Sequence, residues 1–138
     1  MRRAAAAGVV AAVALAGCGG SNPREIRATL ASPRGCVVHV FFASRMVTGR
    51  TATRNEVRAV GDRIASSSKV KTFAFVSREL GFKRMARHHP ELTQGLHANP
   101  LPETFEIVPW SATDAKQLET ELRGVDGVEH VSAARACK

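Results

Sequence analysis

Four short runs along the chain are rich in β-branched and aromatic residues, a pattern typical of strands. They span residues 36–42, 70–76, 104–108 and 128–133. Between the first two runs, and again between the last two, apolar residues recur at the spacing of an amphipathic helix. The chain therefore predicts two β-α-β units, which are joined by the segment 77–98.

The caps of the two helices can be read from polar residues. Thr53 and Glu56 form a capping-box pattern, in which the hydroxyl accepts from the backbone and the carboxylate reaches back. A loop over Ala43–Ala52 precedes this helix, and Ser111 or Thr113 caps the helix of the second unit. The residues expected to face the core are Val57, Val60, Ile64 and Ala65 in the first helix and Ala115, Leu118 and Leu122 in the second.

The segment 77–98 predicts a helical insertion between two strands. Ser77 caps a helix, and Glu79 stands favourably in its first turn. Pro90 suits the start of a second short helix over 90–94, which Gly95 ends. The longer helix combines apolar with basic side chains: Leu80, Phe82, Met85 and Ala86 with Lys83, Arg84, Arg87 and His88.

This order of elements predicts an α+β fold of the ferredoxin-like, split βαβ kind. Such a fold is an antiparallel sheet with helices on one face. In its usual strand order, 4-1-3-2, the last strand lies antiparallel beside the first. The start of the first strand and the end of the last then meet, and these ends carry Cys36 and Cys137.

The N-terminus has the composition of a targeting segment. Arg2 and Arg3 precede the apolar run Ala4–Ala14, which is shorter than the roughly 20 residues of a membrane-spanning helix. Leu15-Ala16-Gly17-Cys18 then matches the lipobox of bacterial lipoproteins, so we expect Cys18 to be lipidated; the alternative is a plain secretory signal with a chance cysteine. The predicted organisation is a signal peptide over 1–17, a tether over 18–35 and one domain over 36–138.

Charge and cysteine content agree with an extracytoplasmic location. Loss of Arg2 and Arg3 with the signal lowers the formal net charge by two, from +8 to +6, which favours anionic lipid headgroups or wall polymers. Export argues against nucleic acid as a partner. Cys36 and Cys137 predict one disulfide in an oxidising compartment, with two free buried thiols or a metal pair as alternatives.

Residues 36–138 contain no recognisable catalytic pattern and imply no cofactor. The best case for a metal site is His88, His89, Glu91 and His97, which lack the spacing of strong zinc motifs and also suit a basic helix end. They leave a metal- or small-ligand-binding lipoprotein as the alternative function. His39 lies inside the first strand, where a tolerated strand histidine is the ordinary interpretation and a ligand or pH switch the other.

The stretch Asn99-Pro100-Leu101-Pro102-Glu103-Thr104-Phe105-Glu106-Ile107 is a stiff, extended connector that leads into a strand. An ordinary proline-rich loop would have the same geometry. The stretch resembles, however, the signature of the extracellular domain of FtsX, the bacterial cell-division permease that partners the ATPase FtsE. The residues of this chain that match the family motif are Asn99, Pro100, Leu101, Pro102 and Phe105. Residues 75–80 and 124–131 resemble further parts of that domain.

The resemblance implies an α/β core with a small helical lobe at 77–98. In the family this lobe docks peptidoglycan hydrolases or their coiled-coil activators through exposed apolar side chains. The candidates here are Leu80, Phe82, Met85, Leu92 and Leu96, whose alternative role is a small local core. Leu101 is expected to be mostly buried beneath the insertion.

A complete FtsX carries four membrane helices, whereas a lipobox stands here where the first would be. We therefore expect a stand-alone lipoprotein on the outer face of the cell membrane, with an extracytoplasmic protein partner and no enzymatic activity.

The anchor has a direct test in a Cys18→Ala variant. Acyl chains on this cysteine would hold the chain on the membrane, since several chains bind far more stably than one. The variant should move from the membrane to the soluble fraction on cell fractionation, with immunoblotting as the readout. Equal membrane retention of the variant would refute lipidation at this position.

Overall fold

The computed structural model describes residues 35–137. The predicted signal peptide, Cys18 and nearly all of the predicted tether lie outside the described residues. The predicted domain over 36–138 lies almost entirely within them.

The sheet has four strands: β1 (Val38–Phe42), β2 (Val70–Val76), β3 (Thr104–Pro109) and β4 (Val128–Ala133). Their order is β2-β3-β1-β4, and all three neighbouring pairs are antiparallel. Counted from the other edge, this is the 4-1-3-2 order that the pattern predicts. The α+β fold class is therefore confirmed. β1 begins two residues later than predicted, and β3 ends one residue later.

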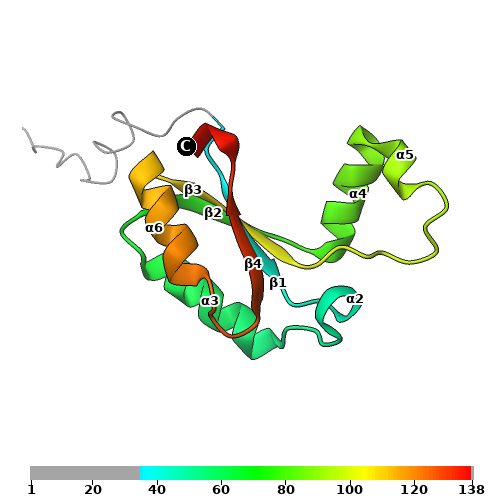
Figure 1. Cartoon of the computed structure of the whole chain (residues 1–138), viewed down its shortest axis with the longest axis horizontal. Helices are drawn as coiled ribbons and strands as arrows, with labels where there is room; N and C mark the ends of the chain where they lie inside the picture. Colours follow the sequence, from blue (N-terminus) through cyan, green and yellow to red (C-terminus); the bar gives the residue numbers. More distant parts are fainter. Residues whose placement is uncertain (1–34, 138) are drawn as a thin grey trace, which may run out of the picture.

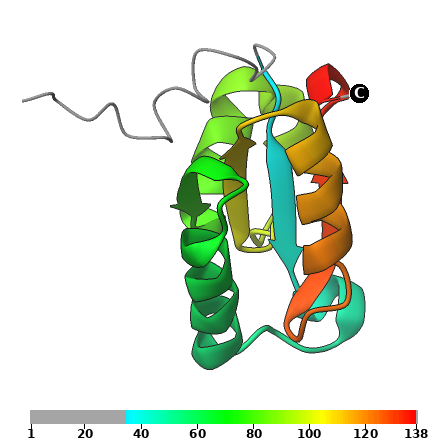
Figure 2. The same cartoon turned by 90° about the vertical axis from the view of Figure 1, so that its left-hand side faces the viewer.

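Helices α3 (Arg54–Ser66) and α6 (Ala112–Leu122) both cover one face of the sheet (Figure 2). Three shorter helices, α2 (Arg45–Thr48), α5 (Pro90–Thr93) and the 3-10 helix η1 (Arg135–Cys137), lie outside this layer. Helix α4 (Arg78–His88) belongs to the insertion and lies behind the sheet in the view of Figure 2. The prediction of helices on one face thus holds for the two helices of the β-α-β units.

The core lies between the sheet and the layer of α3 and α6. Alternate residues of β1, namely Val38, Val40 and Phe42, are buried, while His39 and Phe41 point to the other face and are only partly buried. This alternation follows from the two-residue period of a strand. The other core residues are Val60, Ile64, Phe105, Ile107, Ala115, Leu118, Leu122 and Val131, which include five of the seven residues predicted from helical spacing.

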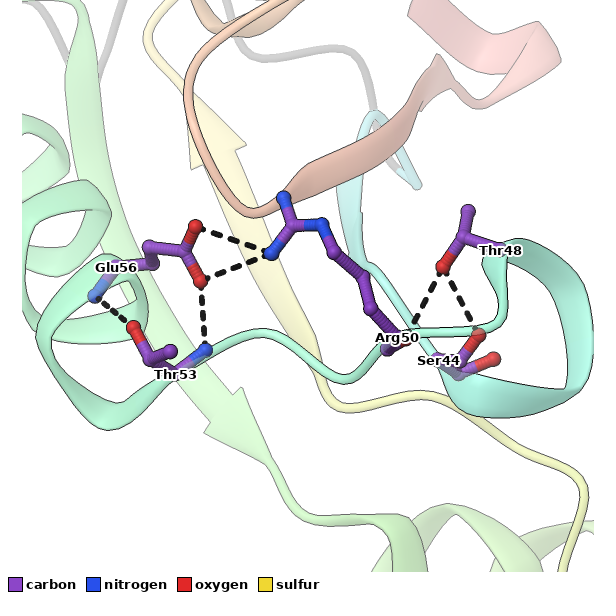
Figure 3. A network of polar contacts seen from close by, with 5 residues as sticks. All are labelled: Ser44, Thr48, Arg50, Thr53 and Glu56. Atoms are coloured by element: carbon purple, nitrogen blue, oxygen red, sulfur yellow. Dashed lines mark hydrogen bonds and ion pairs between the residues drawn. The ribbon is translucent and has the colours of Figure 1, made fainter.

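A polar network fixes the start of α3 (Figure 3). The predicted capping box is present: the Glu56 N–H donates to the Thr53 hydroxyl at 3.2 Å, and the Thr53 N–H donates to the Glu56 carboxylate at 2.7 Å. Arg50 adds two hydrogen bonds to the same carboxylate. The bond from the Thr53 backbone, followed by weaker contributions from its hydroxyl and Arg50, holds the pKa of Glu56 below its ordinary value.

The loop predicted over Ala43–Ala52 contains the single helical turn α2. The N–H groups of Val47 and Thr48 donate to the Ser44 carbonyl, and the Thr48 hydroxyl donates to the same oxygen. Gly49 ends the turn in the left-handed region, with φ 74°. A turn of four residues is too short to show helical periodicity, so the hydrophobic pattern could not reveal it.

Gly127 lies in the turn before β4, where side-chain space also matters. Its φ is +85°, and a Cβ built there would lie 2.7 Å from the Cβ of Glu56. Its carbonyl accepts a hydrogen bond from the Ala43 N–H at 2.8 Å. Glycine at this position therefore lets the turn before β4 pack directly against the start of α3.

Cys36 and Cys137 form a disulfide that closes the sheet at one end. Their Cα atoms are 4.7 Å apart, and both residues are buried. The pairing follows from the antiparallel neighbours β1 and β4, since Cys36 precedes one strand and Cys137 follows the other. The bond excludes the alternatives of free thiols and a metal pair at these positions.

Removal of this disulfide should lower the free energy of unfolding. It closes a loop with a sequence separation of 101 residues, and loss of a native disulfide from a small secreted domain typically costs about 2–5 kcal/mol. We expect a Cys36→Ser, Cys137→Ser double variant to unfold at markedly lower urea concentration, as measured by circular dichroism. An unchanged midpoint would show that the bond contributes little.

Candidate functional site

The helical insertion, residues 77–98, projects from the sheet on the side away from α3 and α6 (Figure 1). Ser77 caps α4 as predicted, since its hydroxyl accepts from the Leu80 N–H. Pro90 stands in the first turn of α5, and Gly95, with φ +84°, follows the helix. α5 ends at Thr93, one residue before the predicted end.

No residue of α4 or α5 is buried. Among the five apolar residues predicted to bind a partner, Leu80, Leu92 and Leu96 are 41%, 58% and 44% exposed. Phe82 and Met85 are partly buried. The insertion therefore does not enclose a core of its own, and its apolar side chains stay accessible to a partner.

Exposed basic residues lie close in sequence to these apolar side chains. Lys83, Arg87 and His88 are all exposed on α4. Nearby, His89 and Glu91 lie 3.3 Å apart and would form an ion pair when the histidine is protonated. The insertion thus presents an apolar and mainly basic surface, which favours a partner surface that is apolar with acidic neighbours.

Reciprocal hydrogen bonds join the insertion to the connector 99–103. The Arg78 guanidinium donates to the carbonyls of Asn99 and Leu101, at 2.7 and 2.9 Å. The Asn99 side-chain amide donates to the Arg78 carbonyl at 2.8 Å, and its oxygen accepts from the Leu101 N–H at 2.9 Å. Asn99 thereby uses both ends of its side chain, which gives the asparagine of the motif a structural role.

Leu101 belongs to this connector, and its side chain lies against α4. A Cβ built on Gly81 would be 3.4 Å from the Leu101 Cδ1 atom, so the helix approaches the leucine at its glycine. Leu101 is partly buried, against the expectation that it would be mostly buried. Leu101 stays partly exposed because the insertion contacts it with one helix and does not enclose it.

A cavity of about 230 Å³ lies between α4 and the face of the sheet opposite α3 and α6. Arg84 and Glu106 bridge it with an ion pair at 3.0 Å. His39 and Phe41 form part of its wall, with their rings stacked at 6.0 Å between centroids. Pockets for drug-sized ligands usually measure about 300–1,000 Å³, so the cavity is too small for most such ligands.

Within residues 35–137, no group of three or more histidine, cysteine, aspartate or glutamate residues could hold a metal ion. The structure thus does not bring His88, His89, Glu91 and His97 together as a metal site. His39 is partly buried and stacks on Phe41.

Two features of the surface were not foreseen from the sequence. Arg78 directly follows the cap residue Ser77 and has no distinguishing sequence pattern. Its hydrogen bonds to a connector more than 20 residues away could not be predicted from neighbouring residues. Met46 and Val47 on α2 are 72% and 68% exposed, but they lie in a stretch without periodicity. The role of Arg78 depends on a contact between distant segments. The exposure of Met46 and Val47 depends on a single helical turn.

The chain folds as a small α+β domain with an exposed helical insertion. A model of the FtsX extracellular domain family matches residues 36–137, and the chain belongs to this family. The family is a regulatory, non-catalytic one that functions outside the cytoplasm in connection with cell division.

Solved structures agree with the fold. The large extracellular loop of FtsX from Streptococcus pneumoniae, determined in solution, aligns with a TM-score of 0.57 and 19% identity, over 71% of this chain and 98% of that one. The crystal structure of extracellular domain 1 of FtsX from the same species, in complex with undecyl-maltoside, aligns with a TM-score of 0.53 and 22% identity, over 70% and 91%. No curated protein matches in sequence. None of the helices within residues 35–137 has the length and apolar character needed to cross a membrane.

The hydrogen bonds of Asn99 can be tested by an Asn99→Ala variant. It should leave the sheet intact but loosen the insertion, since the variant loses two side-chain hydrogen bonds of about 0.5–1.5 kcal/mol each. We expect amide hydrogen exchange to become faster in α4 and unchanged in β1.

Thr93→Ala is a suitable control, because the Thr93 hydroxyl donates only to Pro90 within its own turn. Equal exchange in α4 for the wild type and Asn99→Ala would contradict the assigned role.

Proposed function

We propose that the chain is a lipid-anchored, extracytoplasmic interaction module that binds a peptidoglycan hydrolase or its regulator through the helical insertion. The observation that supports this most strongly is the accessibility of Leu80, Leu92 and Leu96 on an insertion without a buried residue. Aliphatic side chains held in water are costly unless a partner covers them.

The attachment of the insertion suits it for binding. Arg78 and Asn99 hold its first turn, so the apolar surface is presented in a defined direction from the sheet. Beyond that turn, Arg84 of α4 forms an ion pair with Glu106 of β3, and no residue of α4 or α5 is buried. This combination favours recognition of an extended or helical protein surface over a small ligand.

The proposed lipid anchor would keep the domain near the membrane without fixing its distance from the membrane surface. Between Cys18 and Cys36 the chain can extend to at most about 60 Å. The proposed module could therefore reach a partner bound in or beneath the cell wall while it stays tethered. This part of the proposal depends on the lipobox alone.

A related domain offers a limited parallel. The S. pneumoniae FtsX domain was crystallised in complex with undecyl-maltoside, a molecule with an apolar alkyl chain. An apolar contact surface on the present domain would be in keeping with that complex.

The proposal is tested by binding to the secreted peptidoglycan hydrolases and coiled-coil regulators of the same cell. A Leu80→Ser, Leu92→Ser, Leu96→Ser variant should bind its partner at least about tenfold more weakly, because apolar contact residues of an interface often contribute more than 1 kcal/mol each. Affinity can be measured by biolayer interferometry. Phe82→Ala and Met85→Ala should also weaken binding.

Met46→Ser, Val47→Ser is the matched control, since it removes two exposed apolar side chains outside the insertion. Circular dichroism would verify that all variants remain folded. Equal weakening by the control, or full binding by the triple variant, would rule out the insertion as the docking surface.

A further inference from the structure

Strand β2 forms one outer edge of the sheet, where it pairs only with β3. The five consecutive residues Lys71–Phe75 are all exposed, and only the two end residues, Val70 and Val76, are buried. Figure 1 shows that α4 follows this strand away from the helical layer rather than along its edge. The backbone groups on the outer side of β2 are therefore open to another strand.

Two phenylalanines make this edge unusually apolar. Phe73 and Phe75 are 38% and 44% exposed, and each ring contacts Phe105 edge-on, at 5.8 and 5.4 Å between centroids. Helix α3 packs closely on Phe105, since a Cβ on Gly61 would lie 3.2 Å from that ring. The two outer rings are covered only in part on the helix side of the sheet.

Natural edge strands usually carry a charge, a proline or a bulge that prevents pairing. In β2 the only charge is Lys71, and the only irregularity lies between Val70 and Thr72. The stretch Thr72-Phe73-Ala74-Phe75-Val76 has none of these features. It has instead the composition of a strand that favours pairing.

We propose that a second copy of this chain pairs with β2, antiparallel, across a two-fold axis at Ala74. The sequence around Ala74 is nearly symmetric, which is what an isologous strand pair requires. Phe73 of each copy then lies opposite Phe75 of the other, and the four rings cover one another on the helix side. Thr72 lies opposite Val76 on the other face.

Self-pairing is favoured over a strand from a different protein by this symmetry and by charge. In the proposed register Lys71 lies opposite Ser77, so no like charges face each other across the pair. The two-fold axis is perpendicular to the sheet, so the α3 and α6 layers of both copies lie on the same side. The result is one continuous sheet of eight strands.

The register can be tested with single cysteines in the full-length protein in its membrane. Directly opposed residues in an antiparallel pair have Cβ atoms about 4.5–5.5 Å apart, close enough for a disulfide after small adjustments. Ala74→Cys should therefore give a covalent dimer on mild oxidation, seen on a non-reducing gel. Thr72→Cys is the control, because its two copies would be four positions apart along the strand, about 13 Å.

A third variant tests the edge itself. Phe75→Lys should convert the dimer to a monomer in sedimentation velocity, because it places a charge against a phenylalanine of the other copy. Equal crosslinking of Ala74→Cys and Thr72→Cys, a dimer that survives Phe75→Lys, or a wild-type protein that stays monomeric would each overturn the proposal. None of these outcomes bears on the partner-binding role of the insertion, which uses other residues.

Discussion

Hydrogen bonds from Arg78 and Asn99 fix the point at which the helical insertion joins the rest of the domain. The insertion has no buried residue, so burial of apolar surface contributes little to its position. Directional hydrogen bonds hold the insertion instead. The Arg78 guanidinium donates to two carbonyls, and the Asn99 side-chain amide both donates and accepts. The exposed leucines are thus held by polar contacts at the base of the insertion rather than by packing around them.

The rest of the domain is stabilised in the opposite way. Helices α3 and α6 bury one face of the sheet. The disulfide between Cys36 and Cys137 joins the segment before β1 to the segment after β4. The sheet and the insertion therefore differ in what holds them: buried apolar packing and a disulfide in the first, and mainly polar contacts in the second.

Exposed apolar side chains occur at two places with different physical character. On the insertion they are aliphatic, and exposed basic residues of α4 lie close to them in sequence. On β2 they are aromatic, alternate along an open edge and have no charge beside them from Thr72 to Val76.

Much of the fold was predictable because its signals are local. The capping box at Thr53, the cap at Ser77 and the alternation in β1 each depend on residues within a few positions of one another. The strand order followed from two β-α-β units and from the antiparallel neighbours that such units adopt. The one-turn helix α2 was missed because four residues are too few for a period.

The sequence by itself determined which segments are strands and helices, which faces are apolar, and that Cys36 and Cys137 lie at adjacent strand ends. Only the tertiary structure decided which apolar residues stay in water. Leu80 and Leu118 have the same side chain and similar helical settings, yet one is 41% exposed and the other is buried. The difference arises because a sheet covers α6 and nothing encloses α4, and such coverage depends on contacts between segments far apart along the chain.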